Sequence, residues 1–426
     1  MRGDHSVRTR WFRRRQLACD LTRGALMVML LAVHVPSAVA ADARALTERQ
    51  AVDLALSRTE YRALEEGRLG IARSAVTEAS LWPNPVLAWE RDRVSASTES
   101  TAKIFQSFDF SGRRALRREA ANIRVDAAQF DQQDRRLNTI VEVRRLFSES
   151  LYRQELGGAY ARWLRRIETA TEIVGKLAKA GEASGYDRRR IEREAQTARA
   201  RVASVAAEYA RMREAMSGLI GESAGQLAAL GGELLPGNAP SLEALQSALR
   251  QRPDFASLNA QADANDRERS AAERAWIPDV TVGVGQKRVD EFSRTDTGVI
   301  LALSVPLPLF DRGQGSQQRA QARASTLRAE QALAYARAGG ELKGAWRQAA
   351  ELRQAAASFR SESLGGSRDL TRIAEAAYRA GEGTILELLD AYRTDLEAET
   401  TTLDLELRAR LARIELDVLS GAKPYE

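Results

Sequence analysis

Two segments of the chain, 279–287 and 297–307, alternate branched apolar residues with small or polar ones. A side-chain period of two is typical of a β-strand. Each segment has about the 9–11 residues that a tilted strand needs to cross a bilayer. The pattern predicts two membrane strands, joined by a polar loop over 286–297 and ended by prolines that cannot donate to a sheet ladder. The apolar residues expected to share a face within each strand are Val280, Val282 and Val284, and then Val299, Leu301, Leu303 and Val305.

A second pair of strand-like segments, 86–93 and 101–110, precedes this one. The two halves of the chain share further landmarks: Phe110 and Phe310 are 200 positions apart, and the Ala-Gly-Glu triplets at 180–182 and 380–382 have the same offset. A constant offset between several landmarks indicates a duplication. We therefore predict two structural repeats, 41–235 and 236–421, each with a helix, two strands and a long helical hairpin.

Long helical segments follow both strand pairs, at 113–220 and 314–420. They are rich in Ala, Arg, Glu, Gln and Leu, which favour helices. Glycines near 181–186 and 381–384 predict a tight turn within each segment. The stretch 113–180 would be roughly 100 Å long as continuous helix, longer than a compact core, unless Gly157–Gly158 interrupts it. Apolar residues recur every seven positions, as coiled coils require: Ile191, Ala198, Val205, Met212 and Leu219.

Four strands are too few for a closed barrel, and an open sheet edge is not tolerated in lipid. Membrane strands from one chain must therefore pair with strands from other copies. Three copies would give twelve strands, an even number that leaves a lumen. The predicted fold class is mainly α with a small β part, assembled as a homo-oligomeric tube. An ordinary helical bundle remains the alternative for the helices, but it leaves the duplicated strand pairs unexplained.

Residues 1–40 have the pattern of a secretory signal peptide: an arginine-rich start, an apolar run over 25–35 and Ala38-Val39-Ala40 before the expected cleavage. An uncleaved membrane anchor is the alternative, although the run is short for a span. We expect an exported chain that begins at Ala41. Without the first 40 residues, basic and acidic side chains nearly balance, so the charge gives no reason to expect a nucleic-acid partner.

The predicted mature chain contains neither cysteine nor histidine, because Cys19, His5 and His34 all precede Ala41. This composition excludes a disulfide scaffold, a Cys/His zinc site, a cysteine nucleophile and a histidine base. The sequence also has no nucleotide-binding glycine loop and no nucleophile elbow. Catalysis by carboxylates alone stays open, although no pair of carboxylates in a cleft suggests itself. We expect no catalytic residues, no cofactor and no metal site, and we expect that the protein is not an enzyme.

Several motifs, taken in order, resemble those of the TolC-like outer-membrane efflux proteins over residues 46–420. They are LTERQAVDLAL (46–56), LWPNP (81–85), FSGRR (110–114), SVPLPLFDRGQG (304–315) and AYRAGEGTILELLDAYR (377–393). The sequence of residues 304–315 is most similar to that of the CzcC-type branch, which serves cobalt–zinc–cadmium efflux pumps. The resemblance implies a homotrimer whose 12-stranded β-barrel lies in the outer membrane. A long α-helical coiled-coil barrel would continue it through the periplasm.

The same resemblance implies a function. The protein would be the passive exit duct of a tripartite efflux system, expected to export heavy-metal cations. A periplasmic adaptor (membrane fusion protein) would join it to an inner-membrane pump, often of the resistance–nodulation–division type. Two alternatives stay open: the same duct could serve drug efflux or type I protein secretion, or the chain could be a periplasmic coiled-coil structural or adaptor protein without a pore. Residues 422–426 are expected to form a short tail.

By this resemblance, the tips of the helical hairpins carry the functional residues. Glu387 and Asp390 lie one helical turn apart and match the acidic ring that narrows the pore, where carboxylates attract cations. Two solvated surface acids would be the simpler interpretation. Gly181, Gly381 and Gly383 match the tip turns, near which the adaptor docks.

Two more tip residues match positions that hold the closed state in the family, namely Asp187 and Tyr378. The family's basic residue after the second glycine is absent here, because Gly383 stands at that position. The closing contact therefore differs from the family pattern. We hypothesise that Asp187 and the arginine run 188–190 help to hold the tip shut.

Overall fold

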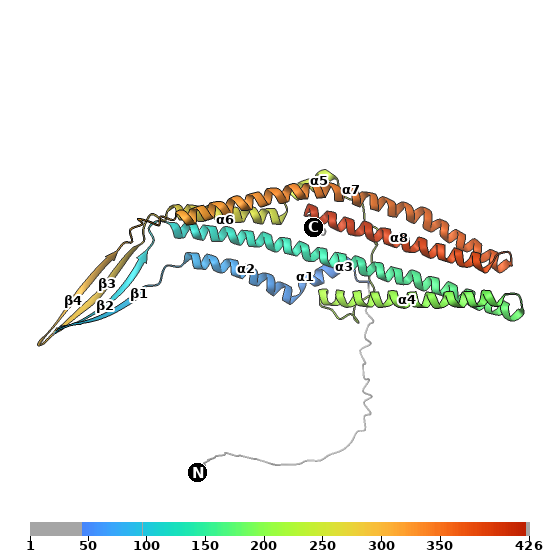
Figure 1. The fold of residues 1–426 in the computed structure, drawn as a ribbon, viewed down its shortest axis with the longest axis horizontal. Helices are drawn as coiled ribbons and strands as arrows, with labels where there is room; N and C mark the ends of the chain where they lie inside the picture. The colour runs from blue at the N-terminus through green and yellow to red at the C-terminus, as the bar shows by residue number, and fades with distance from the viewer. Residues whose placement is uncertain (1–44, 96, 423–426) are drawn as a thin grey trace, which may run out of the picture. The chain divides into compact units, whose positions relative to one another are not determined.

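The computed structural model describes residues 45–95 and 97–422, so the predicted signal peptide, Cys19 and both histidines lie outside the described residues. The order helix, helix, strand, strand, long helix, helix occurs twice (Figure 1). The first series is α1 (Glu48–Ser57), α2 (Thr59–Ser80), β1 (Val86–Val94), β2 (Ser97–Phe108), α3 (Arg113–Ala180) and α4 (Gly185–Ile220). The second is α5 (Leu242–Leu249), α6 (Pro253–Glu273), β3 (Val280–Glu291), β4 (Arg294–Ser304), α7 (Gln314–Ala380) and α8 (Ile385–Ser420).

Each half begins with two helices where the sequence pattern suggested one. Thr47 starts α1 with a capping box that includes Gln50. The backbone of Arg58 is extended, with φ −56° and ψ 136°, and this ends α1 before α2 begins. The Arg58 guanidinium donates to the carbonyl of Gly218 at the end of α4. The break is therefore fixed by a contact distant in sequence.

The strands form one antiparallel sheet in the order β1-β2-β3-β4. The expected polar loop over 286–297 is wrong: β3 and β4 continue through most of it, with Arg288 opposite Thr297, and only Phe292 and Ser293 separate them. Polar residues can continue a β-ladder, because the hydrogen bonds of the ladder join backbone groups and not side chains. At its other end β4 stops at Ser304, so Val305 lies just outside the strand, before the proline that cannot donate.

The first strand pair also differs from expectation in its bounds. β2 begins at Ser97 and ends at Phe108, whereas the pattern suggested 101–110. Phe110 therefore lies beyond the sheet, where its ring is close to that of Phe108, with centroids 6.2 Å apart. Trp82 packs edge-on against Phe108, and the Arg114 guanidinium lies over the Trp82 ring at 3.6 Å.

Cross-strand pairing gives the sheet one apolar face and one polar face. Directly opposite residues share a face in an antiparallel pair, so Val284 lies with Ile104 and with Leu301. In the single chain these apolar side chains are exposed, Leu301 by 80%. The apolar face comprises Leu87, Trp89, Ile104, Val282, Val284, Val299, Leu301 and Leu303. The opposite face carries the ion pairs Lys103–Glu90 and Lys287–Glu99.

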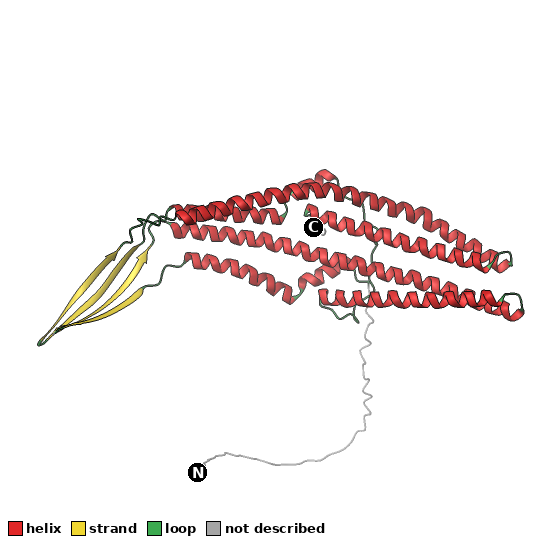
Figure 2. Cartoon of the chain, viewed as in Figure 1, coloured by secondary structure: helices red, strands yellow, loops and turns green. Residues whose placement is uncertain are grey.

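The helices α3 and α7 are the longest elements, with 68 and 67 residues. Gly157 and Gly158 do not interrupt α3. In Figure 2 the strands gather at one end of these helices, and the turns α3–α4 and α7–α8 lie at the other. None of the helices in the described part has an apolar stretch long enough to cross a membrane.

Three apolar clusters stabilise the helical part. One joins α1 to α3 and α4 around Val52, Phe147 and Met216. Another joins α5, α7 and α8 around Leu245 and Leu342. The third lies near the hairpin turns and is described below. The seven-residue series of α4 contributes to the packing, since its members Ile191, Ala198 and Val205 are buried.

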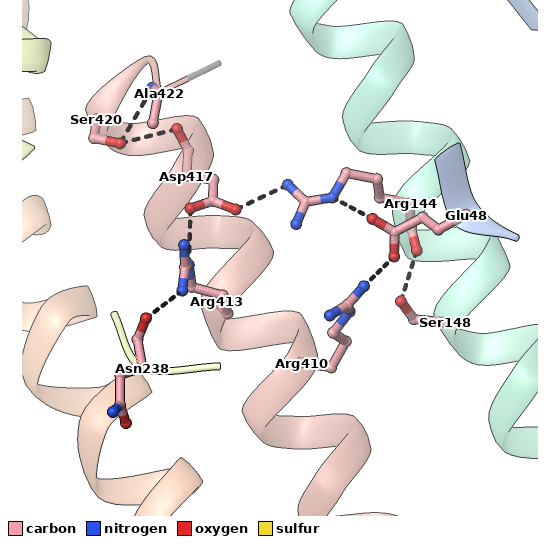
Figure 3. A network of polar contacts seen from close by, with 9 residues as sticks. All are labelled: Glu48, Arg144, Ser148, Asn238, Arg410, Arg413, Asp417, Ser420 and Ala422. Atoms are coloured by element: carbon pink, nitrogen blue, oxygen red, sulfur yellow. Dashed lines mark hydrogen bonds and ion pairs between the residues drawn. The ribbon is translucent and has the colours of Figure 1, made fainter. Parts of the chain in front are cut away.

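A buried ionic network connects α1 to both hairpins (Figure 3). Arg144 of α3 donates to Glu48 of α1 at 2.8 Å and to Asp417 of α8 at 2.9 Å. Arg410 also binds Glu48, and Arg413 binds Asp417. Each carboxylate is thus shared between two guanidiniums, which offsets the cost of removing these charges from water.

Candidate functional site

The two hairpin turns are built in the same way, 200 residues apart. Gly181 and Gly381 end α3 and α7 with positive φ, 84° and 75°, a conformation that glycine adopts without strain. In each turn the amide two residues after the helix end donates back into the last helical turn, from Glu182 to Leu177 and from Glu382 to Ala377. A Cβ atom at Gly383 would make a tight contact, 3.2 Å from the Ala377 methyl and from the Tyr378 nitrogen.

The helices that leave the two turns are capped by matching residues. The Ser184 hydroxyl accepts from the Asp187 amide at 3.0 Å and donates to the Asp187 carboxylate at 2.7 Å. Thr384 and Glu387 form a complete capping box, in which the Thr384 amide donates to Glu387 at 2.8 Å. Sequence reasoning missed these caps, although a Ser or Thr followed three residues later by an acid was a readable signal.

The two acids predicted for the pore ring have different surroundings, because only Glu387 takes part in a cap. The Glu387 side chain is directed back to its own helix start. Hydrogen bonds from the Thr384 backbone and side chain lower the pKa of Glu387, so it is ionised at neutral pH. Asp390 is exposed one turn further along α8. The hydrogen bond to Glu194 and, to a smaller extent, the charge of Asp390 raise the pKa of Arg393.

The structure places the two residues of the expected closing contact, Asp187 and Tyr378, on facing hairpins. Tyr378 is half-buried, and burial together with the nearby charge of Asp187 raises the pKa of its hydroxyl. No hydrogen bond joins the two side chains among the described residues. Two of the arginines proposed to help have partners on α4 itself: Arg188 lies 3.9 Å from Glu192, and Arg190 donates to Tyr186.

A packed core holds the hairpins together behind the tips. It combines residues of α3, α4 and α8, among them Trp163, Ile167, Ile191, Leu388, Leu389 and Tyr392. The Tyr392 hydroxyl donates to Glu375 of α7 at 3.1 Å. Burial, reinforced by the Glu375 charge, strongly raises the pKa of Tyr392, so this donor keeps its proton.

Ion pairs add directional contacts between the hairpins, and no pattern in the sequence predicts them. Asp395 of α8 is buried and binds Arg166 of α3, while Ser367 of α7 donates to it at 2.9 Å. Arg393 of α8 donates twice to Glu194 of α4. A third pair, Arg162–Glu399, continues the series. The contacts span α3, α4, α7 and α8, so the tips form one connected unit.

Two hollows flank this unit. The larger, about 960 Å³, lies between α4 and α8 over Trp163 of α3, and five arginines line it: Arg189, Arg190, Arg193, Arg201 and Arg393. The smaller, about 320 Å³, lies between α3 and α7 and includes Tyr378 and Tyr392. Within residues 45–95 and 97–422, no cluster of histidine, cysteine or acidic side chains could hold a metal ion. The larger hollow thus offers a surface rich in arginine.

Comparison with known families identifies the chain. The model of the outer membrane efflux protein family matches residues 69–222 and 244–422, which together include both strand pairs and both hairpins. The chain belongs to the outer membrane efflux protein family. Membership confirms the expected duct and the outer-membrane location, and it identifies this outer membrane efflux protein as a transport protein rather than an enzyme.

Individual relatives agree with the assignment. The outer membrane efflux protein is 26% identical over 389 residues to the cobalt-zinc-cadmium resistance protein CzcC of Cupriavidus metallidurans, covering 88% of this chain and 90% of that protein. It is 28% identical over 330 residues to the nickel-cobalt-cadmium resistance protein NccC of Alcaligenes xylosoxydans xylosoxydans, covering 71% of each. The crystal structure of the outer membrane protein VceC from Vibrio cholerae shares its fold, with a TM-score of 0.70, 16% identity and coverage of 88% and 96%.

Proposed function

We propose that this outer membrane efflux protein is the exit duct of a tripartite system that exports heavy-metal cations. The observation that carries the proposal is the similarity of this chain to a cobalt-zinc-cadmium resistance protein, which covers 88% of this chain and 90% of that protein. Cargo would arrive from an inner-membrane pump, of the resistance–nodulation–division type, through a periplasmic adaptor. The chain supplies the passage and no catalysis.

The working form proposed is a homotrimer built from the two repeats, 41–235 and 236–421. β1 and β4 are the outer strands of the four-stranded sheet, so each protomer has two free edges. Pairing β4 of one copy with β1 of the next removes every edge when three copies close a 12-stranded barrel. The apolar face would then contact outer-membrane lipid, and the face with Lys103–Glu90 and Lys287–Glu99 would line the lumen.

The selective part of the duct would be the hairpin tips. Threefold symmetry would place three copies each of Asp390 and Glu387 around the axis, and such rings favour cations. Asp390 would make the larger contribution, because Glu387 already binds its own helix start. The tip turns at Gly181, Gly381 and Gly383 would form the end near which the adaptor docks.

The closing contact would involve Asp187, Tyr378 and the arginine run 188–190. Tyr378 supports this proposal, because its hydroxyl is half-buried and the charge of Asp187 on the facing hairpin adds to the effect of burial in raising its pKa. We expect Asp187→Ala to raise single-channel conductance in planar bilayers. Ser184→Ala is the matched control, since it removes the cap contact and keeps the carboxylate. Unchanged conductance in Asp187→Ala, or an equal rise in both variants, would contradict the closing role.

The cargo is tested by deleting the gene in the source bacterium and measuring growth with cobalt, zinc or cadmium salts, with a panel of drugs, and with an assay of secreted protein. We expect metal tolerance to fall and drug tolerance and secretion to stay unchanged. Plasmid-borne wild-type protein should restore growth. Loss of drug tolerance or secretion alone would overturn the metal cargo and leave the duct intact.

A further inference from the structure

A third hollow lies at the other end of the helices, where they meet the sheet. It has a volume of about 460 Å³ and is lined by the starts of α3 and α7 and by the last turns of α6. The strands end only a few residues away, at Phe108 and Ser304. Large exposed apolar side chains, among them Leu309 and Phe310, lie in the same connecting segments. The hollow is therefore next to the part of the chain that faces lipid in a membrane barrel.

The lining of this hollow has a strong excess of positive charge. Five guanidiniums contribute to it, from Arg113, Arg117, Arg124, Arg319 and Arg323, against two acids, Glu268 and Asp311. Arg113 is bound to Asp279 at 2.7 Å and Arg124 to Glu268 at 2.9 Å.

Three of the arginines, Arg117, Arg319 and Arg323, make no ion pair with any described residue, and all three are exposed. Their three positive charges outnumber the one lining acid, Asp311, that makes no ion pair with a described residue. An excess of positive charge in a concave site concentrates anions there.

The arrangement also opposes the usual charge preference of helices. The start of a helix is the positive end of its dipole, and acids are favoured there. Every other described helix has an acid in its first turn, whereas α3 and α7 have none, and α3 begins with Arg113 and Arg114. Departures from such local rules concentrate at functional sites. The helix dipole therefore does not explain why Arg117, Arg319 and Arg323 lie at this junction.

We propose that this hollow binds a phosphate-type anion, with Arg117, Arg319 and Arg323 as its donors. Guanidinium groups bind phosphate oxygens with paired, charge-assisted hydrogen bonds. Such a group reaches the hollow either as the headgroup phosphate of an outer-membrane phospholipid or as free phosphate. The site is independent of the cargo, because it lies at the sheet end of the helices, away from the hairpin tips.

The test uses the full chain, purified in detergent as the assembled oligomer. One arm measures binding of inorganic phosphate by phosphorus NMR line broadening. The other measures retention of phosphatidylglycerol, against zwitterionic phosphatidylcholine, by native mass spectrometry. The variant is Arg319→Gln with Arg323→Gln. The matched control, Arg118→Gln with Arg337→Gln, removes the same charge from exposed positions of α3 and α7 outside the hollow.

We expect the Arg319/Arg323 variant to bind its anion about tenfold more weakly than the wild type, and the control to match the wild type. If the loss is seen only for phosphatidylglycerol, the natural ligand is a lipid headgroup. If it is seen for inorganic phosphate as well, the site takes free phosphate. Absence of both binding events in the wild type, or an equal loss in variant and control, would overturn the proposal. Elution at the wild-type oligomeric size verifies that the variant has folded.

Discussion

Arg393 of α8 and Glu194 of α4 are joined by two hydrogen bonds, of 3.0 and 2.6 Å, although they are 199 residues apart in sequence. The pair links the two hairpins of one chain beside their tips. Glu194 is largely buried, with 12% of its side chain exposed, whereas about half of Arg393 is exposed. Each hairpin is thus bound to the other close to the acids proposed to line the pore.

This pair should hold the tips in their closed arrangement. A half-exposed ion pair contributes about 1 kcal/mol, roughly a fivefold shift between closed and open tips in each subunit. We expect Glu194→Gln and Arg393→Gln each to raise mean conductance in planar bilayers, and the double variant to add little, because both changes remove the same contact.

Asp369→Asn is the control for this experiment, since its partner Arg372 lies on the same helix and links no hairpins. A double variant whose effect equals the sum of the single effects would show that the two side chains act independently. That outcome would contradict the assigned role.

The capping geometry predicts different effects for the two acids of the proposed ring. Asp390→Asn should lower the preference of the channel for cations, because an exposed carboxylate is removed from each subunit. Glu387→Gln should change selectivity less, since a glutamine oxygen can still accept from the Thr384 amide and the carboxylate is directed there. Reversal potentials in a salt gradient measure both. Glu362→Gln, an exposed acid on α7, is the control. A larger selectivity loss in Glu387→Gln would refute this division of roles.

The arrangement of the tips shows what the sequence could predict. Local signals were sufficient for the turns, because Gly181 and Gly381 have the positive φ that glycine favours. They were also sufficient to place Glu387 and Asp390 on one helix. The capping pattern of Thr384 and Glu387 was readable in the sequence, but the hydrogen bond between them was missed. No local signal predicts that Arg393 binds Glu194. Ion pairs between distant segments depend on how the helices pack. The distance between two residues along the chain does not predict that packing.

The strand pairs show a similar limit. The alternation of Val280, Val282 and Val284 predicted β3, and the register confirms that Val282 and Val284 lie with Leu303 and Leu301. The polar residues beyond Gln286 predict a loop. The structure extends the ladder to Glu291, since a hairpin can continue wherever backbone groups of both strands remain paired. Apolar alternation marks the part of a strand that needs an apolar environment, and not its full length.

The buried arginine of the central network should be important for stability. Arg144→Ala would remove the donor that Glu48 and Asp417 share, and losing a hydrogen-bond partner at a buried polar group costs about 1–3 kcal/mol. Each carboxylate would keep one guanidinium partner, Arg410 or Arg413. We expect the half-life of the detergent-solubilised oligomer at a fixed elevated temperature to shorten markedly, as followed by helical circular dichroism. Arg145→Ala, at the exposed neighbouring position, should leave it unchanged. Equal half-lives for wild type and Arg144→Ala would contradict the role given to the network.

Glu65 provides a pH-dependent test of the contact between α2 and α3. Its buried carboxylate accepts three hydrogen bonds from Arg135, at 3.0, 3.2 and 2.8 Å, and one from Arg68. The bonds from Arg135 lower the pKa of Glu65 below its ordinary value of 4.5. A lowered pKa stabilises the fold above the unfolded value, and this stabilisation is lost as the pH falls through the folded value.

We therefore expect Glu65→Gln to unfold at a lower temperature than the wild type at pH 7, and the difference to shrink as the pH falls below about 4.5. Melting curves of the detergent-solubilised protein between pH 3 and 7 measure this. Glu66→Gln, at an exposed position of the same helix, should show no such dependence. A difference that stays constant over the whole range would mean that the ionised form of Glu65 is not what stabilises the contact.

The central claim is that copies of this chain pool their strands to form a membrane duct. The most direct measurement is the native mass of the detergent-extracted protein, followed by conductance of the same sample in a planar bilayer. We expect a trimer that inserts and conducts with a preference for cations. A monomer or dimer that is released without detergent and never inserts would contradict the duct, and it would support a periplasmic coiled-coil protein instead.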